Sequence, residues 1–205
     1  MANRFKARWT ALGATDMAWH AIAVFLAGCA LALPVRADEA FWSLLKSGGQ
    51  IVLMRHAVTT PGAGDPEGMA LGDCSTQRNL TDEGREHARR VGEAIRARGI
   101  LVTRILSSPW CRCLDTARLA FGPNPEVSTA LNNLFGQRDS SGQQLERLGE
   151  ILSHRPLSGN TVLVSHGSTI QAATGISPGT GEMVVITPQG GGRFAVAGRL
   201  EVAPR

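Results

Sequence analysis

The chain has 205 residues, with 21 lysines and arginines against 17 aspartates and glutamates, and aromatic residues make up 5% of it. A chain of this length normally folds as one domain, or at most as two small ones. Because it contains no run of basic residues and few aromatics, we expect no nucleic-acid partner.

The first 37 residues have the pattern of a signal peptide. Three basic residues among the first eight precede an almost wholly apolar stretch, residues 18–33, and Val35-Arg36-Ala37 offers small residues at the positions that a signal peptidase recognises. The apolar stretch is short for a membrane span, which needs about 20 residues. We therefore predict cleavage after Ala37, export to the periplasm or out of the cell, and a mature domain of residues 38–205.

A second interpretation of the leader involves Cys29. The tetrapeptide Leu26-Ala27-Gly28-Cys29 resembles the lipobox of bacterial lipoproteins, and lipidation there would anchor the protein to a membrane. The segment after Cys29 is apolar up to Val35, whereas polar spacers are more usual after the lipid. Soluble export is therefore the favoured prediction, and membrane association is expected only if Cys29 is lipidated.

The first half of the mature part predicts two helices, a strand and a long loop. A short helix is predicted over 39–46, and the apolar run 51–54 that follows is typical of a buried strand in a mainly parallel sheet. Residues 57–80 contain many glycines and prolines and are predicted to form an irregular loop, which in a compact domain usually has a function. Thr81 is the expected N-cap of a helix whose apolar stripe runs to Gly99.

Strands and helices continue to alternate in the second half of the chain. In order, the predicted elements are a strand over 100–106, a helix from about Arg112, a weak strand over 126–131, a helix opened by a capping box of Ser141 and Gln144, a strand over 161–164, a short helix to Thr174, and strands over 182–187 and 194–202. This alternation predicts an α/β domain of three layers, in which a mainly parallel central sheet is flanked by helices. His87 and His154 are expected on solvated helix faces.

Three of the predicted strands lead into basic residues. Arg55-His56 follows the first strand, Arg112 comes shortly after the second, and His166 follows the strand over 161–164. Because the carboxyl ends of parallel strands share one edge of a sheet, where ligands bind, these four side chains are expected to converge on one pocket. Guanidinium groups bind phosphate bidentately, a neutral imidazole is a nucleophile toward phosphorus, and a second, protonated imidazole would stabilise the equatorial oxygens. Such a site needs no metal, and no cofactor is expected.

Four short motifs contain these residues. They are Arg55-His56-Ala57, L-T-x-x-G-x-x-x-A from Leu80, S-S-x-x-x-R-x-x-x-T-A from Ser107, and Ser165-His166-Gly167. In order and type they resemble the motifs of the histidine phosphatase superfamily, the phosphoglycerate-mutase-like proteins, and they span about residues 50–187. The resemblance implies the phosphoglycerate-mutase-like fold, with His56 as the catalytic nucleophile that becomes phosphohistidine. It also implies that Arg55 and Arg112 bind the phosphoryl group of the substrate, together with a catalytic His166.

The sequence departs from the family pattern in two places. Ala57 stands where the family usually has glycine, a conservative change. The phosphatase and mutase branch usually carries a glutamate after the third strand as general acid, a role typically worth about 10²–10⁴ in rate, but residues 130–135 contain no carboxylate. Asp65, Glu67 and Glu182 are weak candidates, since each is more readily explained as a surface or capping carboxylate. A leaving group that departs easily, as in a phosphoramidate, would need no acid.

The mature part contains three cysteines, Cys74, Cys111 and Cys113. In an oxidising compartment a disulfide of Cys74 with Cys111 or Cys113 is expected, which leaves one free thiol. A zinc site is the competing interpretation, but C-x-C spacing without a nearby pair of histidines is weak evidence for one.

These observations favour an exported phosphomonoesterase that forms phosphohistidine on His56 and acts on a small phosphorylated substrate. An envelope sugar phosphate is the suggested substrate class, by analogy with exported relatives. Two alternatives remain: a non-catalytic phosphate-binding module, and a phosphohistidine (phosphoramidate) phosphatase, which would explain the absent acid. The two histidines argue against the first, because arginines suffice for binding, and export argues against the second.

Overall fold

The structure, a computed structural model, describes residues 33–136 and 141–203. The chain divides into two units, residues 1–38 and 39–205, and the central sheet belongs to the second. Cys29 and most of the predicted leader lie outside the described residues. Within the described ranges, no helix has the length and apolar character needed to cross a membrane.

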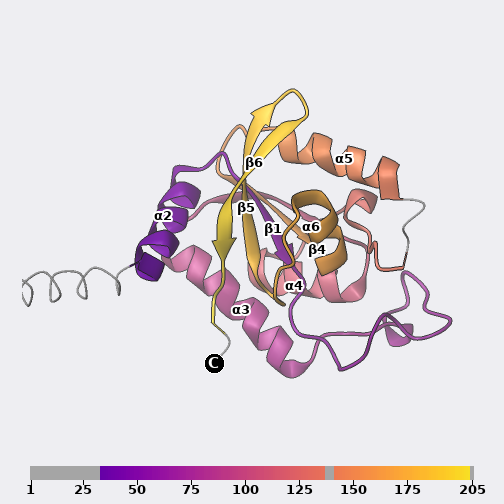
Figure 1. The fold of residues 1–205 in the computed structure, drawn as a ribbon. Coiled ribbons are helices and arrows are strands. Elements are labelled where there is room, and N and C mark those ends of the chain that lie inside the picture. The colour runs from indigo at the N-terminus through magenta and orange to yellow at the C-terminus, as the bar shows by residue number, and fades with distance from the viewer. Residues whose placement is uncertain (1–32, 137–140, 204–205) are drawn as a thin grey trace, which may run out of the picture. The chain divides into compact units, whose positions relative to one another are not determined.

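A six-stranded sheet forms the centre of the second unit, with the strand order β3-β2-β4-β1-β5-β6 (Figure 1). The strands are β1 (Ile51–Arg55), β2 (Val102–Ser107), β3 (Glu126–Val127), β4 (Asn160–Ser165), β5 (Met183–Gly190) and β6 (Arg193–Leu200). Strands β1 to β4 are parallel, whereas β5 runs antiparallel to β1 and forms a hairpin with β6. The register pairs Arg55 with Ser165 and Ser107 with Val164. The carboxyl ends of β1, β2 and β4 therefore lie at nearly the same level.

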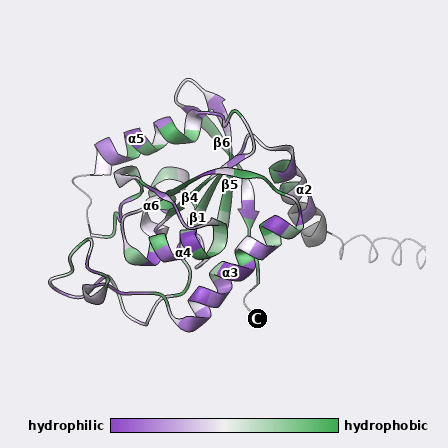
Figure 2. Ribbon diagram, turned by 180° about the vertical axis from the view of Figure 1, so that it is seen from behind, coloured by the Kyte–Doolittle hydropathy of each residue, from purple (hydrophilic) through white to green (hydrophobic). Residues whose placement is uncertain are grey.

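Helices cover both faces of this sheet and produce the three layers predicted from the sequence. They are α2 (Leu33–Ser47), α3 (Asp82–Ala97), α4 (Cys111–Phe121), α5 (Ser141–Ser153) and α6 (Gly167–Thr174), with the 3-10 turns η1 (Cys74–Thr76) and η2 (Thr129–Leu131). Side chains of α2, α3 and α4 pack with Val52 and Met54 on one face, and those of α5 and α6 pack with Ile51 and Leu53 on the other. Burial on both sides explains why β1 is a continuous apolar run. Figure 2 shows the central strands as largely hydrophobic and α3 as partly hydrophilic.

The L-T-x-x-G motif is explained by the packing of α3. Thr81 is the N-cap, as predicted, and its side-chain oxygen accepts a hydrogen bond from Gly84 N–H at 3.0 Å. A Cβ atom on Gly84 would lie 2.0 Å from the carbonyl oxygen of Val58, so only glycine lets the helix approach this closely. Thr116 of α4 binds the same segment, because its Oγ1 accepts a hydrogen bond from Ala57 N–H at 3.1 Å. Two motifs therefore serve to position the chain just after β1.

Three details differ from the sequence prediction. His87 is not solvated: it is 1% exposed, and its Nε2 forms a hydrogen bond with the carbonyl oxygen of Val202 at 2.7 Å. Residues 126–131 form only the two-residue strand β3 before η2. The side-chain amide of Gln144 also reaches beyond its own helix, where it donates to the carbonyl oxygen of Asn132 at 2.7 Å. In the first and third cases a partner distant in sequence decides the environment of the side chain.

Candidate active site

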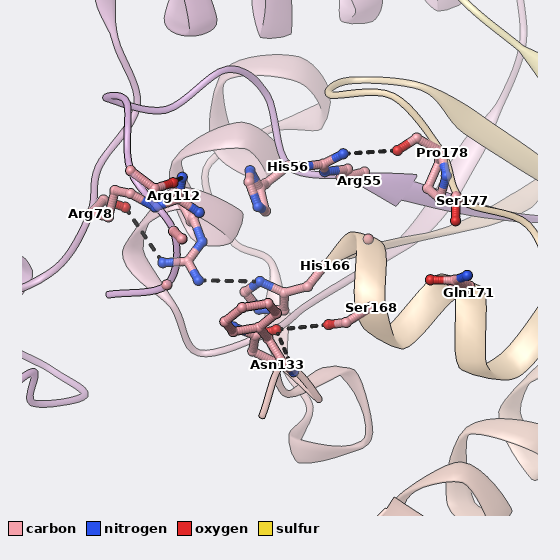
Figure 3. Close-up of a pocket in the computed structure, with 15 residues that line it drawn as sticks. Arg55, His56, Arg78, Arg112, Asn133, His166, Ser168, Gln171, Ser177 and Pro178 are labelled. Carbon is pink, nitrogen blue, oxygen red and sulfur yellow. Dashed lines mark hydrogen bonds between the residues drawn. The ribbon is translucent and has the colours of Figure 1, made fainter. Parts of the chain in front are cut away.

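The four side chains predicted to converge line one cavity of about 370 Å³ at the carboxyl edge of the sheet (Figure 3). Arg55 and His56 lie at the end of β1, Arg112 lies in the first turn of α4, and His166 directly precedes α6. The ring centroids of the two histidines are 5.5 Å apart, with their planes inclined by 68°. The level ends of the parallel strands thus bring together residues that are more than 100 positions apart in the sequence.

His56 is a buried imidazole with one nitrogen fixed by the backbone. The residue is 3% exposed, and Nδ1 donates a hydrogen bond to the carbonyl oxygen of Ala57 at 2.9 Å. Because a carbonyl oxygen only accepts, Nδ1 carries the proton and Nε2 keeps its lone pair, to which no described residue is hydrogen bonded. Burial lowers the pKa of His56 to about 3; the bond to Ala57 opposes this shift, and the charges of Arg112 and Arg55 add to it. A neutral ring with a free Nε2 is the form that attacks phosphorus.

Three arginines line the cavity, one more than the sequence predicted. Nη1 of Arg55 donates to the carbonyl oxygen of Pro178 at 2.9 Å, and Nη1 of Arg78 donates to that of Gly62 at 2.9 Å. The buried Nε atoms of Arg55, Arg78 and Arg112 have no hydrogen-bond partner within the described part of the chain. Burial lowers the pKa of Arg55 and Arg78, and the nearby charge of Arg112 lowers that of Arg78 further. Three converging guanidinium groups with unsatisfied donors form a site for an anion.

Arg78 is the pocket residue that the sequence prediction lacks. It lies near the end of the long loop, three residues before Thr81, the N-cap of α3. The isolated bridge between Thr59 and Leu80 brings the end of this loop back beside its beginning, next to the end of β1. The sequence shows only an arginine two positions before the L-T motif, and it is the path of the loop that places this arginine in the cavity.

Arg112 is paired with Asp65 of the same loop. The guanidinium is 1% exposed, and its Nη1 and Nη2 atoms donate to Oδ1 and Oδ2 of Asp65 at 2.6 and 3.1 Å. Trp110 Nε1 donates to Oδ2 at 3.1 Å, and the N–H of Arg78 donates to Oδ1 at 3.2 Å. Burial by itself would raise the pKa of Asp65, but the hydrogen bonds and charge of Arg112 outweigh it and lower that pKa below its usual value. Asp65 is therefore an ionised acceptor and is not poised to act as the general acid.

His166 is the second buried imidazole of the cavity. Nη2 of Arg112 lies 3.4 Å from Nδ1, and because a guanidinium only donates, Nδ1 accepts and the proton lies on Nε2. Nε2 then donates to the Ser108 hydroxyl at 2.9 Å. Burial, with the charges of His56 and Arg112, lowers the pKa of His166 well below its usual value. Burial and these charges therefore favour a neutral ring, whereas the sequence prediction had a protonated second imidazole.

The other two candidate acids lie elsewhere. Glu67 is exposed in the long loop and does not line the cavity. Glu182 is buried at the start of β5, where its carboxylate pairs with Arg199 and accepts a hydrogen bond from Gly179 N–H at 2.6 Å. The hydrogen bond from Arg199, only partly offset by burial, lowers the pKa of Glu182. No carboxylate is found among the described residues that line the cavity.

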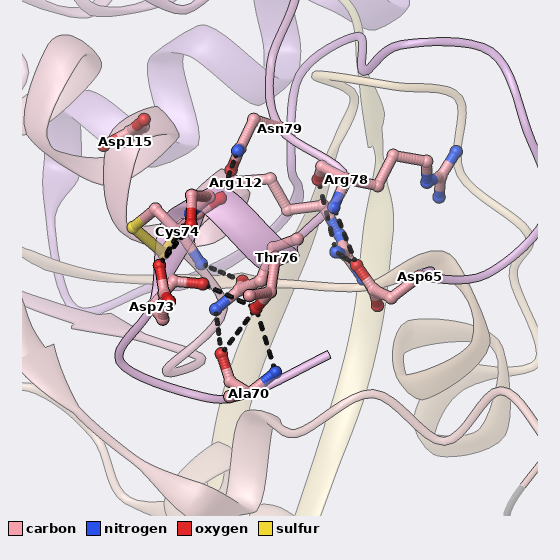
Figure 4. The surroundings of a disulfide bond; sticks show 12 residues. Asp65, Ala70, Asp73, Cys74, Thr76, Arg78, Asn79, Arg112 and Asp115 are labelled. Atoms are coloured by element: carbon pink, nitrogen blue, oxygen red, sulfur yellow. Dashed lines mark hydrogen bonds and ion pairs between the residues drawn. A yellow bond between two sulfur atoms is a disulfide. The ribbon is translucent and has the colours of Figure 1, made fainter. Parts of the chain in front are cut away.

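A disulfide joins the long loop to the helix that carries Arg112 (Figure 4). It links Cys74 to Cys111, with a Cα–Cα distance of 5.7 Å, and Cys113 is a buried free thiol. This is one of the two pairings predicted from the sequence. The side chain of Gln77 adds a second connection, because its Oε1 accepts a hydrogen bond from Cys111 N–H at 2.9 Å. Within residues 33–136 and 141–203, no group of three or more histidines, cysteines or carboxylates is arranged to hold a metal.

The wall of the cavity opposite the long loop is polar and uncharged. It is formed by Asn133, Ser168, Gln171 and Ser177, with the exposed ring of Phe135 at its edge. Oδ1 of Asn133 accepts hydrogen bonds from the Ser168 hydroxyl at 2.8 Å and from Phe135 N–H at 3.1 Å. Because this oxygen is already engaged twice, the amide NH₂ is the part of Asn133 left to bind a ligand. A neighbouring hollow shares Phe135, Ser168 and Gln171 and extends this wall along α6.

Residues 51–139 match the family profile of the histidine phosphatase superfamily (branch 1). This segment is similar to the histidine phosphatase superfamily. The matched segment contains Arg55, His56 and Arg112, while His166 lies beyond it and joins them through the fold. No curated protein sequence is significantly similar to the chain.

Solved structures share the fold over about three quarters of the chain. A protein from Escherichia coli provisionally described as an alpha-ribazole-5'-P phosphatase has 17% identity and a TM-score of 0.54, covering 76% of this chain and 98% of its own. A protein from Agrobacterium tumefaciens provisionally described as the phosphohistidine phosphatase SixA has 20% identity and a TM-score of 0.52, covering 76% and 99%. Phosphoglycerate mutase from Thermus thermophilus has 21% identity and a TM-score of 0.50, covering 75% and 99%. The predicted phosphoglycerate-mutase-like fold is thus confirmed, and the superfamily supports a phosphatase activity in general.

Proposed function

We propose that the mature chain is an exported phosphomonoesterase that works through a phosphohistidine on His56. The observation that carries the proposal is the set of three buried Nε–H groups, on Arg55, Arg78 and Arg112, that have no partner among the described residues. A buried donor without a partner costs about 1–3 kcal/mol, more when it is charged, so such a cluster is expected where an anion binds. His56, whose Nε2 is not hydrogen bonded to any described residue, lines the same cavity.

The proposed reaction has two displacements at phosphorus. Nε2 of His56 attacks the phosphoryl group, the P–O bond to the leaving group breaks, and the leaving oxygen takes up a proton from solvent water, which regains it when the second water is deprotonated. Water then attacks the phosphohistidine, the P–N bond breaks, and inorganic phosphate is released. The guanidinium groups stabilise the charge on the equatorial oxygens in both steps, and this anion-binding role is the reason for proposing a reaction independent of metal.

The Cys74–Cys111 disulfide and the predicted leader both support the proposal of export. Disulfides persist in oxidising compartments and are rare where thiols are kept reduced. We accordingly propose that the leader is cleaved after Ala37 and that the protein acts in the periplasm or outside the cell. Lipidation at Cys29 is the alternative, and the mass of the mature N-terminus distinguishes the two.

The uncharged wall of the cavity supports an uncharged, hydroxylated leaving group. Asn133, Ser168 and Gln171 offer amide and hydroxyl groups, and Phe135 offers an apolar ring face. Sugars are bound by such mixtures of hydrogen-bonding groups and aromatic rings, so an envelope sugar phosphate is the proposed substrate class. A small phosphorylated substrate is thus the expected partner.

A second candidate activity is hydrolysis of a phosphoramidate such as phosphohistidine. It is favoured by the absence of a carboxylate among the described lining residues, since this leaving group departs without a general acid. The Agrobacterium tumefaciens protein provisionally described as a phosphohistidine phosphatase has a similar fold, which is a reason to compare the turnover of phosphohistidine with that of phosphate esters. A non-catalytic phosphate-binding module is the third alternative.

Radiolabelled phosphorus distinguishes the three proposals. The mature protein is incubated with ³²P-labelled sugar phosphates, an acyl phosphate and phosphohistidine, and quenched in alkali, which preserves the P–N bond. Label on the wild type and on the His154→Ala control, but not on His56→Ala, is the expected result, because His154 is exposed and does not line the cavity. Faster turnover of phosphohistidine than of any ester would favour the second activity. No label and no turnover with any compound would leave only the binding module.

A further inference from the structure

The hydrogen-bond donors of Arg112 are almost completely assigned. Nη1 donates to Asp65 Oδ1 at 2.6 Å and lies 3.5 Å from the carbonyl oxygen of Arg78. Nη2 donates to Asp65 Oδ2 at 3.1 Å and lies 3.4 Å from Nδ1 of His166. The buried Nε–H has no partner in the described residues. A guanidinium has five N–H bonds in a fixed plane, so Asp65 occupies the edge formed by Nη1 and Nη2, and the Nε–H is the donor left for a ligand.

Asp65 itself is held from several directions. Its carboxylate accepts from two nitrogens of Arg112, from the indole N–H of Trp110 and from the backbone N–H of Arg78. The side chain is 9% exposed, and Asp65 is not among the residues that line the cavity. It therefore lies outside the space that a phosphoryl group would fill and acts on that space through the residues it binds, above all Arg112, with which it is paired (Figure 4).

We infer that Asp65 is a positioning residue that fixes Arg112 so that its free Nε–H faces the transferred phosphoryl group. The inference rests on the proposed phosphatase function and adds a role to a residue that does not touch the substrate. Two carboxylate oxygens set the plane of the guanidinium, and the bonds from Trp110 and Arg78 in turn set the plane of the carboxylate. The single negative charge also compensates Arg112, the buried one of the three cations that line the cavity.

The same carboxylate couples Arg78 to Arg112. The backbone N–H of Arg78 donates to Asp65, while the side chain of Arg78 lines the cavity. Asp65 thus sets the position of one arginine through its side chain and of another through its backbone. The Cys74–Cys111 disulfide also holds the long loop against the start of α4, so the Asp65–Arg112 pair is not the only link between this loop and the helix.

The experiment compares Asp65→Asn with Glu67→Gln in the mature protein. Both remove one carboxylate from the same loop, but Glu67 is exposed and lies outside the cavity. Activity is measured on p-nitrophenyl phosphate, whose leaving group needs no proton, and on an alkyl phosphate, whose leaving group does. Inhibition by inorganic phosphate reports the anion site directly. Arg112→Gln and the double variant Asp65→Asn/Arg112→Gln complete a double-mutant cycle, which measures the coupling between the two residues.

Asp65→Asn is expected to lower kcat/KM about 100-fold, and by the same factor for both substrates, because a displaced guanidinium misaligns the phosphoryl group whatever its leaving group. Phosphate inhibition should weaken, Glu67→Gln should behave as wild type, and Asp65→Asn should add little in the Arg112→Gln background. If Asp65→Asn does not fold, Asp65→Glu keeps the charge and moves the carboxylate by one methylene. It is expected to show a smaller loss of the same kind.

Three results would overturn the inference. A loss confined to the alkyl phosphate would make Asp65 the general acid. A fall in melting temperature with unchanged kcat/KM would make its role purely structural. Full additivity with Arg112→Gln would show that it does not act through Arg112. Failure of the proposed function looks different, because His56→Ala would then be as active as wild type, or the wild type would have no activity to lose.

Discussion

Replacing Cys74 and Cys111 together by serine should lower the free energy of unfolding by about 4 kcal/mol at 25 °C. The disulfide closes a loop of 37 positions, and cross-linking such a loop removes about 13 cal/mol/K of entropy from the unfolded chain in the chain-entropy description. The folded state loses less, because Gln77 still binds Cys111 N–H and Asp65 still pairs with Arg112. We therefore expect the folded variant to keep kcat/KM within a few-fold of wild type while its stability falls.

Urea denaturation of the oxidised wild type and the double-serine variant measures this difference, with fluorescence and circular dichroism as independent probes. The m-value should rise in the variant, since the unfolded chain is freed from its cross-link and exposes more surface. Wild type treated with a reductant is the matched control and should unfold at the same urea concentration as the variant. A loss below about 1 kcal/mol would refute the reasoning, because the unfolded chain would then gain little freedom from the missing bond.

Four further predictions test the site and its support. Arg78→Gln should weaken inhibition by phosphate about 10-fold or more, because it removes a hydrogen bond from a charged group to the anion. An unchanged inhibition constant would show that Arg78 does not bind the phosphate. The pKa of His56 is lowered to about 3 in the folded protein, so as the pH falls the unfolded chain binds a proton at this residue before the folded protein does. The free energy of unfolding should therefore fall as the pH drops from about 6.5 toward 3, and it should fall less steeply in His56→Asn. Equal slopes in the two proteins would contradict this prediction. Ser108→Ala removes the acceptor that fixes the tautomer of the second histidine and should lower kcat about 10-fold while Tm changes little. Gly84→Ala should cost about 1–3 kcal/mol or more by overpacking, whereas Gly149→Ala in α5, where a Cβ meets nothing, should be neutral or stabilising in thermal unfolding.

The sequence alone was sufficient for those features that depend on local pattern or on the general geometry of parallel sheets. The apolar run of β1 is diagnostic because a strand buried on both faces has no polar side. Thr81 is recognisable as an N-cap because its hydrogen bond is made three residues away. Arg55, His56, Arg112 and His166 were predicted to converge because the carboxyl ends of parallel strands meet at one edge, and they do line one cavity.

Only the tertiary structure determined which partners the other residues have. Arg78 and Asp65 lie in the long loop, in which η1 is a single short turn, and their roles follow from where that loop returns to the sheet. His87 was expected in solvent because its helix position is on a polar stretch, yet the C-terminal segment covers it and Val202 binds its ring. The contact of Asp65 with Arg112 joins residues 47 positions apart, and that of His87 with Val202 joins residues 115 positions apart. No local propensity encodes them, because the partner is chosen by the packing of the whole domain rather than by the neighbouring sequence.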